Sequence, residues 1–148
     1  MIWACFWYGG VGHFHVCNGN MNSENYLRVL ETKLKPTISN FKISQPIHLD
    51  DSAPSHRTQK VKNWHAENEV IRLDWPGNSA DLNPIENLWS ILKYDMKRKM
   101  IKNQRELIES FIKAWNRYSD GDLTKKLALS MKKRLRMVIE NKRGQINY

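Results

Sequence analysis

The 148-residue sequence has no apolar run long enough to cross a bilayer, and it contains only two cysteines. A membrane-spanning helix needs about 20 consecutive apolar residues, so the sequence predicts no membrane span. Cys5 and Cys17 supply no disulfide framework and fit a reducing compartment. Internal repeats and low-complexity linkers are also lacking. The apolar residues 1–8 lack the basic leader and small-residue cleavage site of a signal peptide, and we expect them to form a strand.

The composition is that of a globular chain with an uneven distribution of charge. Hydrophobic residues make up 41% of the sequence and include six tryptophans, enough for one domain with a real core. The net charge is +9, but residues 1–92 carry a net charge of −1 and residues 93–148 one of +10. Charge concentrated in this way predicts a surface that binds a polyanion, with nucleic acid as the first candidate. A solvated basic helix surface is the alternative.

Aromatic and β-branched runs predict four short strands. Residues 2–8 and 13–18 form a hairpin in this prediction, with the glycines of residues 9–12 as its turn. Further strands are predicted over residues 47–49 and 70–73. Strands combined with covering helices predict an α/β fold with a mixed sheet.

Apolar periodicity and capping residues predict five helices. The predicted bounds are from a cap at Asn22 or Ser23 to a stop at Pro36, 55–67, 84 to about 100, 104–118 and 123–141. In the last two helices we expect apolar residues inside, among them Leu107, Leu135 and Ile139. Basic residues of the last helix are expected outside: Lys132, Lys133, Arg134 and Arg136.

Two carboxylates, Asp51 and Glu86, are separated by 34 residues and lie at the end of a predicted strand and the start of a predicted helix. Each has an ordinary structural explanation. Glu86 follows Asn83 by three residues, which predicts a capping box, and Asp51 lies in turn-forming sequence. Asp50 would repel Asp51 unless a cation or a hydrogen bond intervenes. Alternatively, both carboxylates bind Mg²⁺ or Mn²⁺, hard ions that prefer carboxylate oxygens.

The flanking sequence favours the metal interpretation. Residues 75–89 contain the pattern Trp75-Pro76-x-x-Ser79-x-Asp81-Leu82-Asn83-Pro84-Ile85-Glu86-Asn87-Leu88-Trp89. This pattern resembles the signature of the Tc-type branch of the mariner transposase superfamily, whose members are DDE enzymes with an RNase H-like fold. The resemblance implies that Glu86 is the third metal ligand. It also implies that Asp51, followed by Ala53-Pro54-x-His56, is the second.

The resemblance covers essentially the whole chain but includes departures. The family has Gln-Asp-Asn where this sequence has residues 50–52, and a proline where Ala80 stands. The family's first catalytic aspartate lies on a strand before the hairpin, and its helix-turn-helix DNA-binding modules lie earlier still. We therefore expect residues 1–148 to form a partial catalytic domain that lacks the strand with the first aspartate and the helix-turn-helix modules. Without that central strand we expect an interrupted sheet with unpaired strand edges.

The implied family activity is cut-and-paste transposition of DNA by two-metal phosphodiester cleavage and strand transfer. The implied partners are two Mg²⁺ or Mn²⁺ ions, double-stranded DNA at transposon ends and target, and a second copy in a homodimer; the implied location is nuclear. Six basic residues are candidate DNA contacts: Lys93, Lys97, Arg98, Lys132, Lys133 and Arg136. Because the family's first catalytic aspartate is lacking, we expect residues 1–148 alone to be inactive. The alternatives are a non-catalytic DNA-binding or interaction remnant, and part of a gene whose upstream exon encodes the first aspartate.

Overall fold

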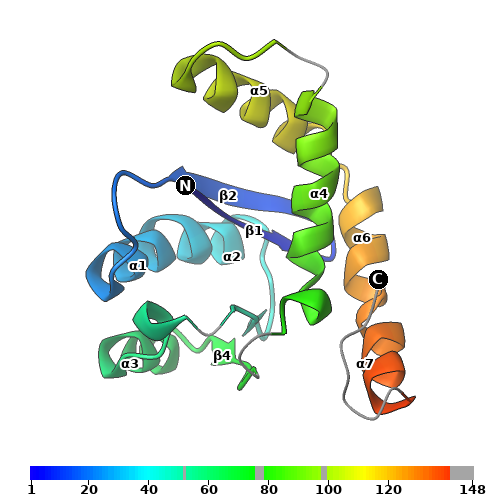
Figure 1. Cartoon of the computed structure of the whole chain (residues 1–148). Coiled ribbons are helices and arrows are strands. Elements are labelled where there is room, and N and C mark those ends of the chain that lie inside the picture. Colours follow the sequence, from blue (N-terminus) through cyan, green and yellow to red (C-terminus); the bar gives the residue numbers. More distant parts are fainter. Residues whose placement is uncertain (52, 76–78, 98–99, 141–148) are drawn as a thin grey trace. The chain divides into compact units, whose positions relative to one another are not determined.

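The computed structural model describes residues 1–51, 53–75, 79–97 and 100–140 (Figure 1). The chain divides into two compact units. The first comprises Met1–Cys5 and Gly12–Ala80, and the second comprises Phe6–Val11 and Asp81–Tyr148.

The predicted hairpin is present, but its turn is shorter than predicted. Strands β1 (Ile2–Trp7) and β2 (Gly10–Val16) pair, and only two residues connect them. Gly12 was predicted in the turn and lies in β2 instead. A Cβ atom at Gly12 would lie 2.6 Å from the Cys5 Sγ atom and 2.7 Å from the Thr37 Cγ2 atom. The glycine is therefore needed for close approach of the strand to its neighbours.

The first long helical segment continues beyond its predicted stop at Pro36. Helix α1 (Ser23–Val29) passes through a π-helical segment (Leu30–Leu34) into α2 (Lys35–Asn40). The Asn22 side chain caps α1 by accepting a hydrogen bond from the Asn25 N–H, as predicted. Proline has no N–H to donate, and its ring clashes with the carbonyl four residues earlier in a regular α-helix. The π segment changes the hydrogen-bond register just before Pro36, which explains why the helix continues.

Two very short strands and a helix complete the first unit. Strands β3 (Ile47–His48) and β4 (Ile71–Arg72) pair in parallel, with His48 opposite Arg72. A 3₁₀ turn (Pro54–His56) precedes α3 (Gln59–Glu67), so the regular helix begins four residues later than predicted. The core of this unit is formed by Tyr26, Leu30, Leu34, Val61, Trp64 and Val70.

The sheet is interrupted, as predicted. In the part of the chain that the structure describes, strands form two separate two-stranded sheets, β1–β2 and β3–β4. A continuous five-stranded sheet is not formed by these residues.

The second unit is helical. It contains α4 (Pro84–Lys97), α5 (Gln104–Asn116), α6 (Asp122–Leu129) and α7 (Met131–Glu140). Figure 1 shows α4 running beside α6 and meeting α5. Trp89 of α4 stacks on Phe111 and Trp115 of α5, with ring centroids 6.0 Å apart in both cases. Leu88 and Leu92 are fully buried in the same core.

The predicted helix over residues 123–141 is divided at Ser130, and several side chains face the opposite way from the prediction. The Ser130 hydroxyl donates to the Leu127 carbonyl at 2.6 Å, a local bond that competes with regular helix. Arg134 was predicted outside and is fully buried, whereas Leu135 and Ile139 were predicted inside and are 46% and 76% exposed. The polar partners of Arg134 explain this orientation. The helix is rotated so that Arg134 reaches them, and this rotation leaves Leu135 and Ile139 on the exposed side. Leu107 was also predicted inside and is 41% exposed.

Candidate functional site

Asp51 lies in the first unit, just after β3, and its side chain is 66% exposed. Its Oδ1 atom accepts a hydrogen bond from the Ala53 N–H at 3.1 Å. The same oxygen lies 2.8 Å from the His56 Nδ1 atom, a contact that does not have hydrogen-bond geometry at the nitrogen. The interaction with His56, and then the Ala53 N–H, hold the pKa of Asp51 below its ordinary value against the effect of burial. Asp51 is therefore ionised at neutral pH. Ser52, between Asp51 and Ala53, lies outside the described residues.

Packing fixes the position of His56. The 3₁₀ turn that begins at Pro54 brings the imidazole onto the ring of Tyr26, with centroids 3.7 Å apart and planes 23° from parallel. Tyr26 is fully buried, and its hydroxyl donates to the Asp50 Oδ2 atom at 3.2 Å. Burial and then the Asp50 carboxylate raise the pKa of Tyr26 well above its ordinary value. Tyr26 therefore remains a neutral donor and stacking platform.

Arg72 neutralises Asp50. It is the cation that we expected, because Asp50 would otherwise repel the neighbouring Asp51. The Arg72 Nε atom donates to Asp50 Oδ2 at 2.9 Å, and its terminal nitrogen donates to Oδ1 at 2.7 Å. The parallel register of β3 and β4 brings Arg72 to this place. Ligand atoms of Asp50, Asp51 and His56 all lie within 4.8 Å of one another. Since both Asp50 oxygens accept from Arg72, Asp51 offers the more available carboxylate.

A pair of histidines, His48 and His65, lies beside this network and was not identified from the sequence. The His65 Nδ1 atom lies 2.8 Å from the Val61 carbonyl oxygen, so this nitrogen carries the proton. The His65 Nε2 atom then accepts from His48 Nδ1 at 3.0 Å. Burial lowers the pKa of His48 to about 4, and it also lowers the pKa of His65. Only the strand register and the fold of α3 bring the two rings together, so no local sequence signal marks them.

Glu86 lies in the second unit, in the first turn of α4, and is exposed. The predicted capping box is only half formed. The Asn83 side chain accepts a hydrogen bond from the Ile85 N–H at 3.2 Å, so Asn83 caps the helix. Among the described residues, none makes a hydrogen bond or ion pair with the Glu86 carboxylate. The carboxylate is therefore not used for capping.

Arg134 of α7 binds the start of α4 through hydrogen bonds from its guanidinium. Its guanidinium donates to the Asp81 carbonyl oxygen at 2.8 Å and to the Asn87 Oδ1 atom at 2.6 Å. Its Nε atom donates to the Ser130 hydroxyl at 2.9 Å. We call this arrangement the Arg134 clamp. Sequence reasoning assigned Arg134 to the solvent, because helical periodicity does not reveal a long-range polar partner.

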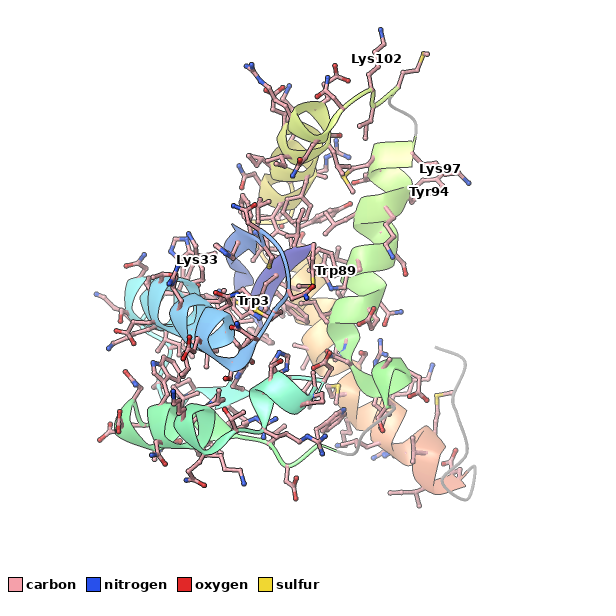
Figure 2. The ribbon with its side chains drawn as sticks, turned by 60° about the vertical axis from the view of Figure 1, so that its left-hand side comes forward. Trp3, Lys33, Trp89, Tyr94, Lys97 and Lys102 are labelled. Carbon is pink, nitrogen blue, oxygen red and sulfur yellow. The ribbon has the colours of Figure 1, made fainter. Side chains whose placement is uncertain are left out.

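Five of the six basic residues predicted to contact DNA are described, and they lie on the surface of the second unit. Lys93 and Lys97 of α4 and Lys132, Lys133 and Arg136 of α7 are exposed. Figure 2 shows Lys97 and Tyr94 projecting from α4, with Lys102 ahead of α5. Arg98 lies outside the described residues.

The fold is that of a DDE transposase catalytic domain of the RNase H-like class. It matches the Mos1 transposase catalytic domain solved with raltegravir and Mn, with a TM-score of 0.88 over 99% of this chain and 76% of that one, at 14% identity. It also matches the Mos1 strand transfer complex, with a TM-score of 0.87 over 99% of this chain and 43% of that one, at 15% identity. At these identities the likeness concerns the fold alone.

Residues 3–108 match the family model described as DDE superfamily endonuclease, and the chain belongs to that family. Its curated relatives include the transposable element Tc3 transposase of Caenorhabditis elegans, which is 31% identical over 100% of this chain and 45% of its own length. The Tc1 transposase of the same organism is 29% identical over 95% of this chain and 51% of its own length. The chain thus spans about half the length of these relatives. The resemblance to Tc-type transposases is confirmed.

None of the helices in the described residues is both long enough and apolar enough to cross a membrane.

Proposed function

We propose that residues 1–148 are part of the catalytic domain of a DNA transposase in which Asp51 and Glu86 are the second and third metal ligands. The observation that carries this proposal is the Glu86 carboxylate, which lies within the signature of residues 75–89 and is bound by none of the described residues. A carboxylate with a purely structural role in such a sequence would complete the capping box. Asp51 supports the proposal differently: its Oδ1 atom accepts from the Ala53 N–H, but the carboxylate is ionised and largely exposed beside His56.

The two carboxylates fit divalent cations of the magnesium type. Mg²⁺ and Mn²⁺ are bound through carboxylate oxygens, and both Asp51 and Glu86 present such oxygens to solvent. A pair of these ions, when bound, activates the attacking oxygen and stabilises the leaving oxygen of a phosphodiester. The interaction with His56 favours the ionised form of Asp51, and Arg72 neutralises the Asp50 carboxylate beside it. Mos1 catalytic domains of the same fold have been solved with raltegravir and Mn or Mg, which supports this choice of ions.

DNA is the proposed substrate. The net charge of +10 over residues 93–148, with exposed lysines on α4 and α7, supports binding to phosphates by counterion release. A Mos1 paired-end complex holds the left transposon end, which supports double-stranded element ends as the DNA of this chain. Target DNA, a homodimeric assembly and a nuclear location belong to the same proposal.

We further propose that residues 1–148 alone do not cut DNA, because they supply two of the three carboxylates. The test is Mg²⁺- or Mn²⁺-dependent nicking of transposon-end DNA by the 148-residue chain, with Glu86→Gln beside it. We expect no cutting above the Glu86→Gln background. Robust cutting that Glu86→Gln abolishes would overturn the proposal of inactivity while supporting the proposed ligand.

The second candidate is a non-catalytic DNA-binding remnant, which the exposed basic residues of the second unit favour. DNA binding measured by fluorescence anisotropy over a series of salt concentrations separates the two. Binding that is steeply salt-dependent and unchanged, with and without Mn²⁺, by Asp51→Asn and Glu86→Gln supports the remnant. Mn²⁺-dependent binding that either substitution removes supports the transposase site.

A further inference from the structure

The Arg134 clamp joins both sides of the turn that precedes Glu86. The Asp81 carbonyl lies in the 3₁₀ turn Ala80–Leu82, before the helix cap, and Asn87 lies one residue after Glu86. One planar guanidinium contacts both, at 2.8 Å and 2.6 Å. The bend between the turn and the first turn of α4 is therefore fixed by a single side chain from α7.

Burial makes the clamp rigid. Arg134 has 0% exposure, and a buried guanidinium must have its donors satisfied because an unpaired buried charge is costly. Three contacts supply oxygens from three different segments, those of Asp81, Asn87 and Ser130. Lysine cannot reproduce this arrangement, because its ammonium group is a point charge without the planar fork.

The clamp also explains how Glu86 is left unengaged. The start of α4 needs a stabilising contact, which a capping glutamate would ordinarily supply. Arg134 and Asn83 supply it here, from the side of the helix that faces α7 and the core. Leu88 and Leu92 are fully buried, whereas Glu86 is exposed. The clamp therefore fixes the backbone on both sides of Glu86, although nothing in the described residues binds the carboxylate.

We propose that Arg134 is a positioning residue for Glu86: it fixes the first turn of α4 so that the Glu86 carboxylate is preorganised for a divalent cation. This inference rests on the proposed function, in which Glu86 is a metal ligand. It makes α7, about 50 residues farther along the chain, part of the catalytic apparatus. Residues that orient a metal ligand typically change metal affinity by about 10–100-fold when they are replaced.

The test follows Mn²⁺ binding to the 148-residue chain by paramagnetic broadening of assigned amide NMR signals. In the unsubstituted chain, Mn²⁺ is expected to broaden the amides around Glu86, and Glu86→Gln is expected to remove this broadening. Arg134→Lys keeps the positive charge and is expected to raise the apparent Kd for Mn²⁺ at Glu86 about tenfold. Arg105→Lys, at an exposed position on α5, is the matched control and is expected to leave the Kd unchanged.

A second control separates positioning from stability. Leu127→Ala removes a buried apolar side chain from α6 and is expected to lower the thermal midpoint, but it keeps the Leu127 carbonyl to which the Ser130 hydroxyl donates. Below its midpoint it is expected to bind Mn²⁺ like the unsubstituted chain. If Arg134→Lys does not fold, Asn87→Leu removes one acceptor of the clamp and decides in its place, with Asn87→Asp expected to restore binding.

The outcomes distinguish the two proposals. Broadening that survives Glu86→Gln overturns the proposed ligand, and with it the function. Broadening that Glu86→Gln removes but that folded Arg134→Lys or Asn87→Leu leaves unchanged overturns the positioning role alone. Loss of Mn²⁺ affinity in Leu127→Ala equal to that in Arg134→Lys also overturns it, because destabilisation would then explain both.

Discussion

The two proposed metal ligands are each next in sequence to a residue held by an arginine with little or no exposure, but the partners differ. Asp51 follows Asp50, whose carboxylate forms a two-point ion pair with Arg72 in the first unit. Glu86 precedes Asn87, whose neutral amide oxygen accepts from Arg134 in the second unit. In both units a proposed ligand is held through its chain neighbour. The Glu86 carboxylate makes no bond of its own among the described residues, whereas the Asp51 Oδ1 atom also accepts from the Ala53 N–H.

The helix starts of the second unit sharpen the point, because α4 and α5 share the spacing Asn-x-x-Glu. In α5, Glu106 accepts from the Lys102 N–H at 2.8 Å and from the Asn103 side chain at 3.0 Å. In α4, Asn83 caps the helix and Glu86 makes no such bond among the described residues. The same local sequence thus yields a structural glutamate at one site and an unengaged one at the other.

The largest expected effect is the loss of the charged pair in the first unit. Arg72→Met leaves Asp50 buried without its cation, and breaking one partner of a buried pair costs about 3–5 kcal/mol. Urea unfolding measures this cost. Arg117→Met is the control, since Arg117 is 60% exposed in its ion pair with Asp95 and such pairs contribute less than about 1 kcal/mol. Asp50→Asn combined with Arg72→Met should recover much of the loss, and failure to do so would show that the charge is not the cause.

The next effect is acid sensitivity confined to the first unit. All five histidines lie in that unit, and burial lowers the pKa of His48 to about 4. As the pH falls from about 6.5 to about 4, the unfolded chain binds a proton that the folded chain does not. The free energy of unfolding therefore falls by roughly 1.4 kcal/mol per pH unit for this group. Amide hydrogen exchange should show weakening in α3 but not in α5, and His48→Gln should flatten the dependence. Equal weakening of both helices would contradict the assignment.

A smaller effect is expected when the Arg134 clamp loses the Ser130 hydroxyl. Ser130→Ala leaves the buried Nε–H of Arg134 without this acceptor, at a cost of about 1–3 kcal/mol. Ser119→Ala removes a hydroxyl with a similar local carbonyl bond, at 2.8 Å, from an exposed position, and should change stability little. Thermal unfolding of the two variants gives the comparison. Equal midpoints would mean that the Ser130 contact adds nothing to the clamp.

The smallest effect tests the two helix starts directly. Glu106→Ala removes the capping bonds of α5 and should cost about 1 kcal/mol more than Glu86→Ala, which removes none. The two changes share their effects on helix propensity and on the helix dipole, so the difference reports the capping bonds. Chemical denaturation at constant salt measures it. A Glu86→Ala chain as destabilised as Glu106→Ala would restore a structural role for Glu86.

Much of the local structure could be predicted from the sequence, because it depends on neighbouring residues. The hairpin, the cap at Asn22 and the core face of α1 were predicted correctly and are confirmed. The cap at Asn83 was also predicted correctly. The stop at Pro36 was wrong, since the π segment accommodates the proline.

The remaining errors concern contacts between distant residues. Helical periodicity wrongly placed Arg134 on the exposed face, because its partners Asn87 and Asp81 lie 47 and 53 residues away in sequence. The Asp50–Arg72 pair and the two histidines depend on the register of β3 and β4, which no pattern in either strand specifies. The pairing of Asp51 with Glu86 in one metal site, and the DNA contacts of the basic residues, stay predictions.

The π segment Leu30–Leu34 has a consequence for insertions and deletions. A π turn corresponds to one extra residue in an α-helix, and each residue turns a helix by about 100°. Deleting one residue there would keep a plausible helical sequence but rotate its two ends relative to each other. Either Tyr26 would lose its hydrogen bond to Asp50 and its stacking on His56, or Thr37 would lose its contact with β2. In that contact the Thr37 hydroxyl oxygen accepts a hydrogen bond from the His13 N–H at 3.0 Å. Sequence length at this position is therefore as constrained as sequence identity.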